Sequence, residues 1–214
     1  KSSELVRGRL LSILADNEFH SGEILGSTLG ISRTAISNHV KILSMLGLDI
    51  YSVTGKGYCL AQPITLLDQD KIRESLTISH TSDIEVLNVI GSTNQYLKDK
   101  LVGIQNGHTC LAEAQTAGRG RHGRKWESPY AASLYLSMHW SFDDGYSSLN
   151  GLSLAVGVAI VDALTRCKVQ DIQLKWPNDI YANGKKLAGV LIEVEGQIGG
   201  GCQAIIGIGI NVSL

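Results

Sequence analysis

The stretch that organises this sequence reads Gly118-Arg119-Gly120-Arg121-His122-Gly123-Arg124-Lys125-Trp126. It places four permanent cations and three glycines within nine residues and ends on a tryptophan. Like charges at this spacing repel and glycine is costly to order, so we expect the loop to be mobile on its own. Glycines allow close backbone approach, arginines fork onto carboxylate or phosphate oxygens, and an indole offers a flat face to another ring. The stretch therefore predicts a binding site for an anion; a solvated basic loop is the plainer alternative.

Four further motifs accompany this loop. They are Gly91-Ser92-Thr93-Asn94, Lys175-Trp176-Pro177-Asn178-Asp179, Lys185-Lys186-Leu187-Ala188-Gly189 and Gly207-Ile208-Gly209-Ile210-Asn211. In order and approximate spacing, the five motifs resemble those of the biotin–protein ligase family, in the bifunctional form that also acts as the biotin operon repressor. A single Arg/Gly loop would be weak support for this resemblance, whereas five ordered motifs covering nearly the whole chain are strong support.

The resemblance implies a two-step, ATP-dependent reaction. Biotin and ATP, the latter with Mg²⁺, would form biotinyl-5′-AMP, and biotin would then pass to a lysine in the acceptor domain of a carboxylase carrier protein. Biotin would be both substrate and corepressor precursor. Because both steps concentrate negative charge, the protein would act mainly through positioning and positive charge.

The resemblance also assigns roles to individual residues. The catalytic cations would be Arg119, Arg121 and Lys186. Biotin would contact Ser92, Thr93, Asn94, Gln115, Arg119, Gly120, Arg121 and Lys186. The nucleotide would contact Arg121, Arg124, Trp126, Asn178, Asp179 and Asn211. No metal site built by the protein itself is expected. Without the resemblance, Ser92-Thr93-Asn94 would indicate only a good helix cap.

The N-terminal quarter predicts a winged helix-turn-helix. Apolar residues recur at helical spacing over 4–15, Ser21 can cap a helix that runs to Leu29, and Ser32 can cap a third helix that runs to Leu46. Alternating residues at 50–53 and 58–60 then predict a hairpin with Lys56 at its tip, which is typical of a wing.

The third helix predicts a DNA-reading surface, because short polar groups with flanking cations can reach base edges and phosphates. The residues expected to contact DNA are Ser32, Arg33, Thr34, Ser37, Asn38, Lys41 and Lys56. Residues 1–62 hold six Lys or Arg against five Asp or Glu, a net charge of +1. One subunit should therefore bind DNA weakly, and we expect a homodimer promoted by biotinyl-AMP to read two half-sites. A helical docking module is the alternative.

The pattern predicts an α+β protein in three parts. We expect the winged helix-turn-helix over 1–62, a linker over 63–66, and a mixed-sheet catalytic domain of the biotin/lipoate ligase type over 67–214. Strands are predicted at 84–90, 109–115, 133–140, 172–176, 190–195 and 204–212, with a buried helix over 151–165. The strand Val190 to Glu195 is expected to pair with its own copy in a dimer. Family members continue past the position matching Leu214, so the resemblance implies a catalytic domain truncated before a small C-terminal β-barrel.

Composition limits the other classes. With 43% hydrophobic and 18% charged residues and a net charge of −1, the chain has the composition of an ordinary globular protein. Scattered cysteines and no apolar leader predict a cytoplasmic protein with no membrane partner. Two further functions stay open: a repressor that senses the biotin adenylate without catalysis, and a lipoate-type acyl ligase.

Overall fold

The computed structural model describes residues 3–76, 82–196 and 200–212. By its contacts the chain divides into two compact units. The smaller comprises Lys1–Leu67 together with Pro129–Ala131, and the larger comprises Asp68–Ser128 together with Ala132–Leu214. The division expected from the sequence, with domains over 1–62 and 67–214 and a linker over 63–66, stays a prediction.

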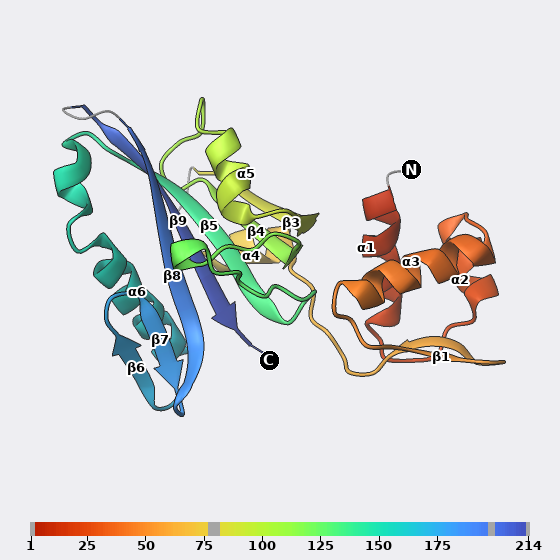
Figure 1. Ribbon diagram of the computed structural model, residues 1–214. Helices are drawn as coiled ribbons and strands as arrows, with labels where there is room; N and C mark the ends of the chain where they lie inside the picture. Colours follow the sequence, from red (N-terminus) through yellow and green to blue (C-terminus); the bar gives the residue numbers. More distant parts are fainter. Residues whose placement is uncertain (1–2, 77–81, 197–199, 213–214) are drawn as a thin grey trace. The chain divides into compact units, whose positions relative to one another are not determined.

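The smaller unit begins with three helices, drawn in red and orange in Figure 1: α1 (Ser3–Leu14), α2 (Gly22–Leu29) and α3 (Arg33–Met45). The predicted caps are confirmed: the Ser21 hydroxyl accepts from the backbone N–H of Ile24, and that of Ser32 accepts from Ala35. The helices bury leucine, isoleucine and valine side chains against one another. The hairpin of β1 (Ile50–Val53) and β2 (Gly57–Leu60) completes the predicted winged helix-turn-helix.

The larger unit is built on a seven-stranded sheet in the order β3-β4-β5-β9-β8-β7-β6. Its strands are β3 (Ile84–Ile90), β4 (Thr109–Gln115), β5 (Ser133–Phe142), β6 (Ile172–Lys175), β7 (Asp179–Ala182), β8 (Lys185–Gly196) and β9 (Cys202–Asn211). Only β3 and β4 run parallel, so the sheet is mixed, as predicted. The long central pairs β5–β9 and β8–β9 bring the middle and the end of the chain together.

Helices lie on both faces of this sheet (Figure 1). They are α4 (Gln69–Ser75), α5 (Thr93–Asp99) and α6 (Leu152–Arg166), with 3₁₀ turns η1 (Arg121–Gly123) and η2 (Gly145–Leu149). The apolar side of α6 packs on alternate residues of β8 and β9, including Val190 and Ile206. On the other face of the same strands lie α5 and the basic loop, and a cavity forms between them and the sheet.

The hairpin of β7 and β8 was missed by prediction. Asp179 was expected in a turn and β8 only from Val190, but β7 starts at Asp179 and β8 at Lys185. The polar residues around Asn183 and Gly184 indicate a turn, and they do form a tight turn, but between two paired strands that were not predicted. As a result Lys186 lies on a strand of the sheet.

The expectation that 190–195 forms a sheet edge also needs correction. β8 is an interior strand, with β9 on one side and β7 on the other. However, β7 pairs with β8 only as far as Gly189. Val190 and Asn178 share two hydrogen bonds, and beyond them no strand within the described ranges pairs with that side of residues 191–196. An open edge therefore exists over half of β8.

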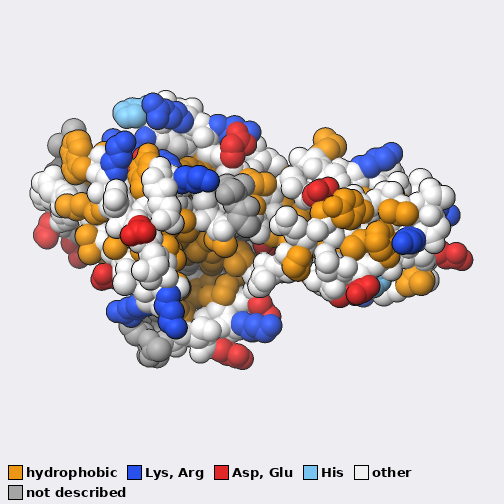
Figure 2. All heavy atoms as spheres, turned by 90° about the horizontal axis from the view of Figure 1, so that it is seen from below, with side chains coloured by type: hydrophobic (Ala, Val, Ile, Leu, Met, Phe, Trp, Pro, Cys, Tyr) orange, Lys and Arg blue, Asp and Glu red, His pale blue; other side chains and the backbone are white. Residues whose placement is uncertain are grey.

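The helix α6 is less buried than predicted. Only Gly157 and Ile160 are fully buried, and Leu154 and Val158 are 44% and 48% exposed. By length and composition, Gly145–Arg166 could cross a membrane. The continuous α-helix within it has 15 residues, about 22 Å, and one side packs on the sheet, whereas a bilayer core is about 30 Å thick. Figure 2 shows further apolar side chains in a hollow on one face of the larger unit.

Candidate functional site

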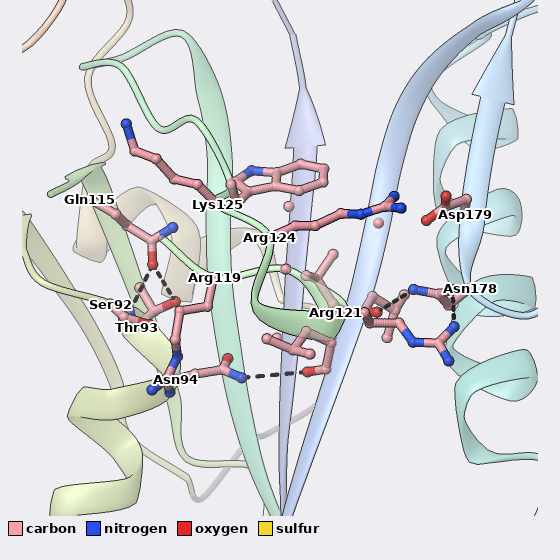
Figure 3. Close-up of a pocket in the computed structure, with 18 of the residues that line it drawn as sticks. Ser92, Thr93, Asn94, Gln115, Arg119, Arg121, Arg124, Lys125, Asn178 and Asp179 are labelled. Carbon is pink, nitrogen blue, oxygen red and sulfur yellow. Dashed lines mark hydrogen bonds between the residues drawn. The ribbon is translucent and has the colours of Figure 1, made fainter. Parts of the chain in front are cut away.

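A cavity of about 280 Å³ lies between α5, the basic loop and the strands β8 and β9 (Figure 3). Every residue predicted to bind biotin lines it, as do five of the six predicted to bind nucleotide. These are Ser92, Thr93, Asn94, Gln115, Arg119, Gly120, Arg121, Arg124, Trp126, Asn178, Asp179 and Lys186. They come from four separate parts of the sequence, so folding brings together the motifs that the sequence presents apart.

The start of α5 supplies the neutral polar side. Ser92 caps the helix, and the Gln115 side-chain oxygen accepts from the Thr93 backbone N–H at 2.9 Å. Asn94 is 4% exposed, and its Oδ1 accepts from the Ser137 hydroxyl at 2.6 Å. A buried amide with fixed partners has one orientation, so this side of the cavity presents a set pattern of donors and acceptors.

The basic loop makes specific contacts with the protein, whereas we expected it to be mobile on its own. Its ends are tied together, since Trp126 N–H donates to Gly118 O and Gly120 N–H donates to Arg124 O. Arg121 Nη1 donates to Asn178 Oδ1 at 2.7 Å, and Asn178 Nδ2 in turn donates to Val190 O. The loop is therefore fastened to the strand that forms the cavity wall.

Charge in the cavity is unevenly compensated. Lys186 Nζ lies 2.8 Å from Asp179 Oδ1 and 5.2 Å from the centre of the Trp126 ring. Arg119 pairs with Glu193, and Lys125 pairs with Glu127. Within residues 3–76, 82–196 and 200–212, Arg121 and Arg124 have no carboxylate partner. These two arginines are the cations most available to an anionic ligand.

Two glycines of β9 determine how closely the site packs. A Cβ on Gly207 would overlap the side chain of Asn94, and one on Gly209 would come within 2.5 Å of the Trp126 ring. Glycine at both positions lets the amide and the indole lie directly on the strand. The Trp126 Nε1 is buried and has no hydrogen-bond partner among the described residues.

A carboxylate network supports α5 from the side away from the cavity. Glu85 accepts from the Tyr96 hydroxyl at 2.6 Å, from Lys100 Nζ at 2.9 Å, and lies 2.7 Å from His108 Nε2. Partial burial favours the neutral carboxyl, but the hydrogen bonds from Tyr96, Lys100 and His108 outweigh it and hold the Glu85 pKa at about 2. The network joins α5 to β3 and to the segment before β4.

One predicted contact lies elsewhere, and some lining residues were missed. Asn211 does not line the cavity, and its side chain donates to Lys186 O at 3.1 Å. Its contact with a nucleotide stays a prediction. Leu136, Pro177, Val190 and Leu191 line the cavity without having been predicted. Nothing in an apolar strand residue marks it as ligand-facing until the sheet order is known.

The metal ion expected at this site is the Mg²⁺ that accompanies ATP. Asp179 is the only carboxylate among the described residues that line the cavity. No group of three or more His, Cys, Asp or Glu suited to a metal occurs in the described part of the chain. One carboxylate beside cations fits an ion that is held mainly by phosphate oxygens and water.

A second candidate site lies on the smaller unit. Of the residues predicted to contact DNA, Ser37 is half-buried on α3, and the others are exposed: Ser32, Arg33, Thr34, Asn38, Lys41 and Lys56. Ile36, Val40 and Leu43 face inward. Lys56 lies in the turn of the hairpin, with Nζ 5.6 Å from the Phe19 ring centre. The expected separation of the α3 faces is present.

Comparison with known proteins bears on both units. A profile of the biotin/lipoate A/B protein ligase family matches residues 86–211, and an HTH domain profile matches 7–59. The chain is 48% identical over 205 residues to the bifunctional ligase/repressor BirA of Salmonella typhimurium and 46% identical over 206 residues to that of Escherichia coli. Each alignment covers 96% of this chain and 63% of the relative.

A solved structure agrees with the larger unit. It is the biotin protein ligase from Aquifex aeolicus in complex with biotin and ATP, 36% identical, with a TM-score of 0.53. The match covers 62% of this chain and 53% of the other.

Proposed function

Because the chain belongs to the biotin/lipoate A/B protein ligase family, we propose that its cavity binds biotin and ATP and joins them as biotinyl-5′-AMP. One observation carries the proposal: the cavity gathers a neutral polar end at α5, unpaired arginines in the loop, and Asn178, Asp179 and Lys186 at the far end. A ligand with a polar uncharged ring, an apolar chain and an acidic end fits that order.

In the first step, an oxygen of the biotin carboxylate attacks the α-phosphorus of ATP. The new bond is C(O)O–P, the bond to the β-phosphate oxygen breaks, and pyrophosphate leaves with the electron pair. Arg121 and Arg124 stabilise the charge on the phosphate oxygens, since they are the loop cations without a carboxylate partner. Lys186 lies at the same end beside Asp179 and lowers the repulsion between carboxylate and phosphate. Ser92, Thr93, Asn94 and Gln115 hold the ring of biotin.

In the second step, the ε-amine of a lysine on an acceptor protein attacks the anhydride carbonyl, and AMP leaves. The two substrates supply both nucleophiles, so the chain needs none of its own. Asp179 would contribute a carboxylate to Mg²⁺ bound to the ATP phosphates, and the ion would neutralise phosphate charge. Trp126 covers the nucleotide end, with its ring held on the glycines of β8 and β9.

We further propose that the smaller unit binds operator DNA as part of a homodimer in the cytoplasm. The exposed polar residues of α3 and Lys56 in the turn after β1 support this, as does the match to an HTH domain. The open edge over 191–196 supports self-pairing. The acceptor would be a biotin carrier domain.

Mass analysis of the purified chain incubated with biotin, ATP and Mg²⁺ tests the enzymatic proposal. We expect biotinyl-AMP bound to the protein and pyrophosphate in solution. Lipoate replaces biotin in a parallel incubation, and product from lipoate alone would move the substrate to the lipoate class. Biotin binding without adenylate formation would instead support the sensor that does not catalyse.

A further inference from the structure

Glu193 lies on β8 just outside the residues that line the cavity and connects three elements of the site. Its Oε2 accepts from Asn94 Nδ2 at 2.7 Å and from Arg119 Nη2 at 2.8 Å. The side chain is 27% exposed, so the ion pair is partly shielded from water. One oxygen of one residue therefore holds the first turn of α5, the beginning of the basic loop and the outer half of β8 together.

Arg119 uses its guanidinium for this contact. Its Nη1 donates to Gln95 Oε1 at 3.0 Å, while Nη2 donates to Glu193 Oε2. In Figure 3 the Arg119 side chain runs toward Asn94, whereas Arg121 points to Asn178 on the other side. The two arginines are two residues apart in sequence and serve opposite walls. An anion bound by Arg121 therefore does not contact the part of the Arg119 guanidinium that binds Gln95 and Glu193.

Asn94 depends on Glu193 for its orientation. A carboxylate can only accept, so it fixes the Nδ2 donor toward β8 and leaves Oδ1 for the Ser137 hydroxyl. The remaining contact of Nδ2 is long, 3.4 Å to Leu191 O. Without an acceptor at 193, a side chain that is 4% exposed would lose its main partner.

We propose that Glu193 is a positioning residue of this site: paired with Arg119, it anchors the start of the basic loop and sets the amide of Asn94. The proposal rests on the proposed function and refines it, because Arg119 becomes a loop anchor and the ligand's charge falls to Arg121 and Arg124. Glu193 does not touch the reacting atoms. It acts on the ring-binding side of the cavity through Asn94 and on loop order through Arg119.

Glu195 offers a matched control on the same strand. It projects from the same face of β8 and pairs with Lys98, one turn after Asn94 on α5. Glu195 has no contact with the loop among the described residues and does not line the cavity. Replacing either glutamate removes one charge and one link between β8 and α5. Only the change at 193 also releases Arg119 and Asn94.

The test compares Glu193→Ala, Glu193→Gln and Glu195→Ala by calorimetry with biotin and with its uncharged amide. We expect E193A to weaken both ligands about tenfold by the same factor, because a lost charge-assisted hydrogen bond has about that effect. E193Q should weaken them less, since one amide oxygen can accept both hydrogen bonds. E195A should match the parent. Tighter binding of biotin alone in E193Q would show that the carboxylate competes with the ligand, and would overturn the proposal.

Limited trypsin digestion gives a second readout that needs no ligand. We expect cleavage after Arg121, Arg124 and Lys125 to be faster in E193A than in E195A, with both variants melting within a few degrees of the parent. Equal rates of cleavage in E193A and E195A would overturn the proposal that Glu193 anchors the loop. If the parent fails to bind biotin, the proposed function fails, but the digestion still decides whether Glu193 anchors the loop.

Discussion

Arg121 is one of the two cavity arginines that have no carboxylate partner among the described residues. Replacing it with glycine should speed release of biotinyl-AMP, at a cost of about 1.5–3 kcal/mol in binding for one charge-assisted contact. The change also removes the donor to Asn178 Oδ1, so a small loss of stability is expected with it. Dissociation of the labelled adenylate is the measurement. Arg121→Gln is the control that keeps a hydrogen-bond donor near Asn178 but removes the charge. If Arg121→Gly held the adenylate as tightly as the parent, Arg121 would not bind its phosphate.

Lys186 should affect the chemistry more than the binding of biotin. Its Nζ lies against Asp179 and over Trp126, at the end of the cavity assigned to phosphate. We expect Lys186→Ala to lower the rate of pyrophosphate release by about a hundredfold or more while changing biotin affinity a few-fold. Asp179→Asn removes the partner charge and should also lower the rate, because Asp179 is proposed to contribute a carboxylate to the Mg²⁺ of ATP. Equal losses of rate and affinity would indicate a disturbed strand.

At the scale of elements, the attachment of α5 to β3 should make stability depend on pH. The Glu85 pKa is held at about 2, below the ordinary value of 4.5. A lowered carboxyl pKa stabilises the fold above pH 4.5, and this contribution is lost as pH falls toward 2. We expect Glu85→Gln to lower the free energy of unfolding by roughly 2 kcal/mol at pH 7 after allowance for solvent screening, and by little near pH 2.

Denaturant unfolding of the parent and E85Q across this pH range gives the comparison. Asp162→Asn, a change at an exposed carboxylate on α6, should show no such dependence. A difference between E85Q and the parent that stays constant from pH 7 to pH 2 would rule out the charge of Glu85 as its source.

At the scale of the whole molecule, the ligand should promote dimerisation and operator binding. The segment 1–62 carries a net charge of only +1, too little for one copy to bind DNA tightly. We expect the adenylate to hold the basic loop more firmly against β8, which the loop already contacts through Asn178. No described strand pairs with one side of β8 over 191–196. We expect biotinyl-AMP to shift the monomer–dimer equilibrium and operator affinity about tenfold or more in the same direction.

Sedimentation of the chain with and without biotinyl-AMP, beside anisotropy with operator DNA, measures this coupling. R121G should lose the ligand-induced shift while retaining its basal association. If biotinyl-AMP changed neither the monomer–dimer equilibrium nor the affinity for DNA, the two units would act independently.

Much of the architecture was readable from local pattern. Ser21 and Ser32 cap their helices as predicted, and β3 and β4 have the predicted bounds. These signals act within about four residues or along one strand, so they can be recognised in the sequence before the tertiary fold is known. The motif residues of the site were found by resemblance, and the structure gathers all but Asn211 around one cavity.

What the sequence by itself determined was therefore most of the helices and strands, though not the β7–β8 hairpin, and the polar and charged residues that line the cavity. Only the tertiary structure decided which of those residues contact one another and which are available to a ligand. Glu193 meets Arg119 and Asn94 across 74 and 99 residues, and Arg121 meets Asn178 across 57. Such partners depend on the order β5-β9-β8 and on glycines that allow side chains to lie on β9. Strand order is a long-range choice set by packing, and no short stretch of this chain contains it.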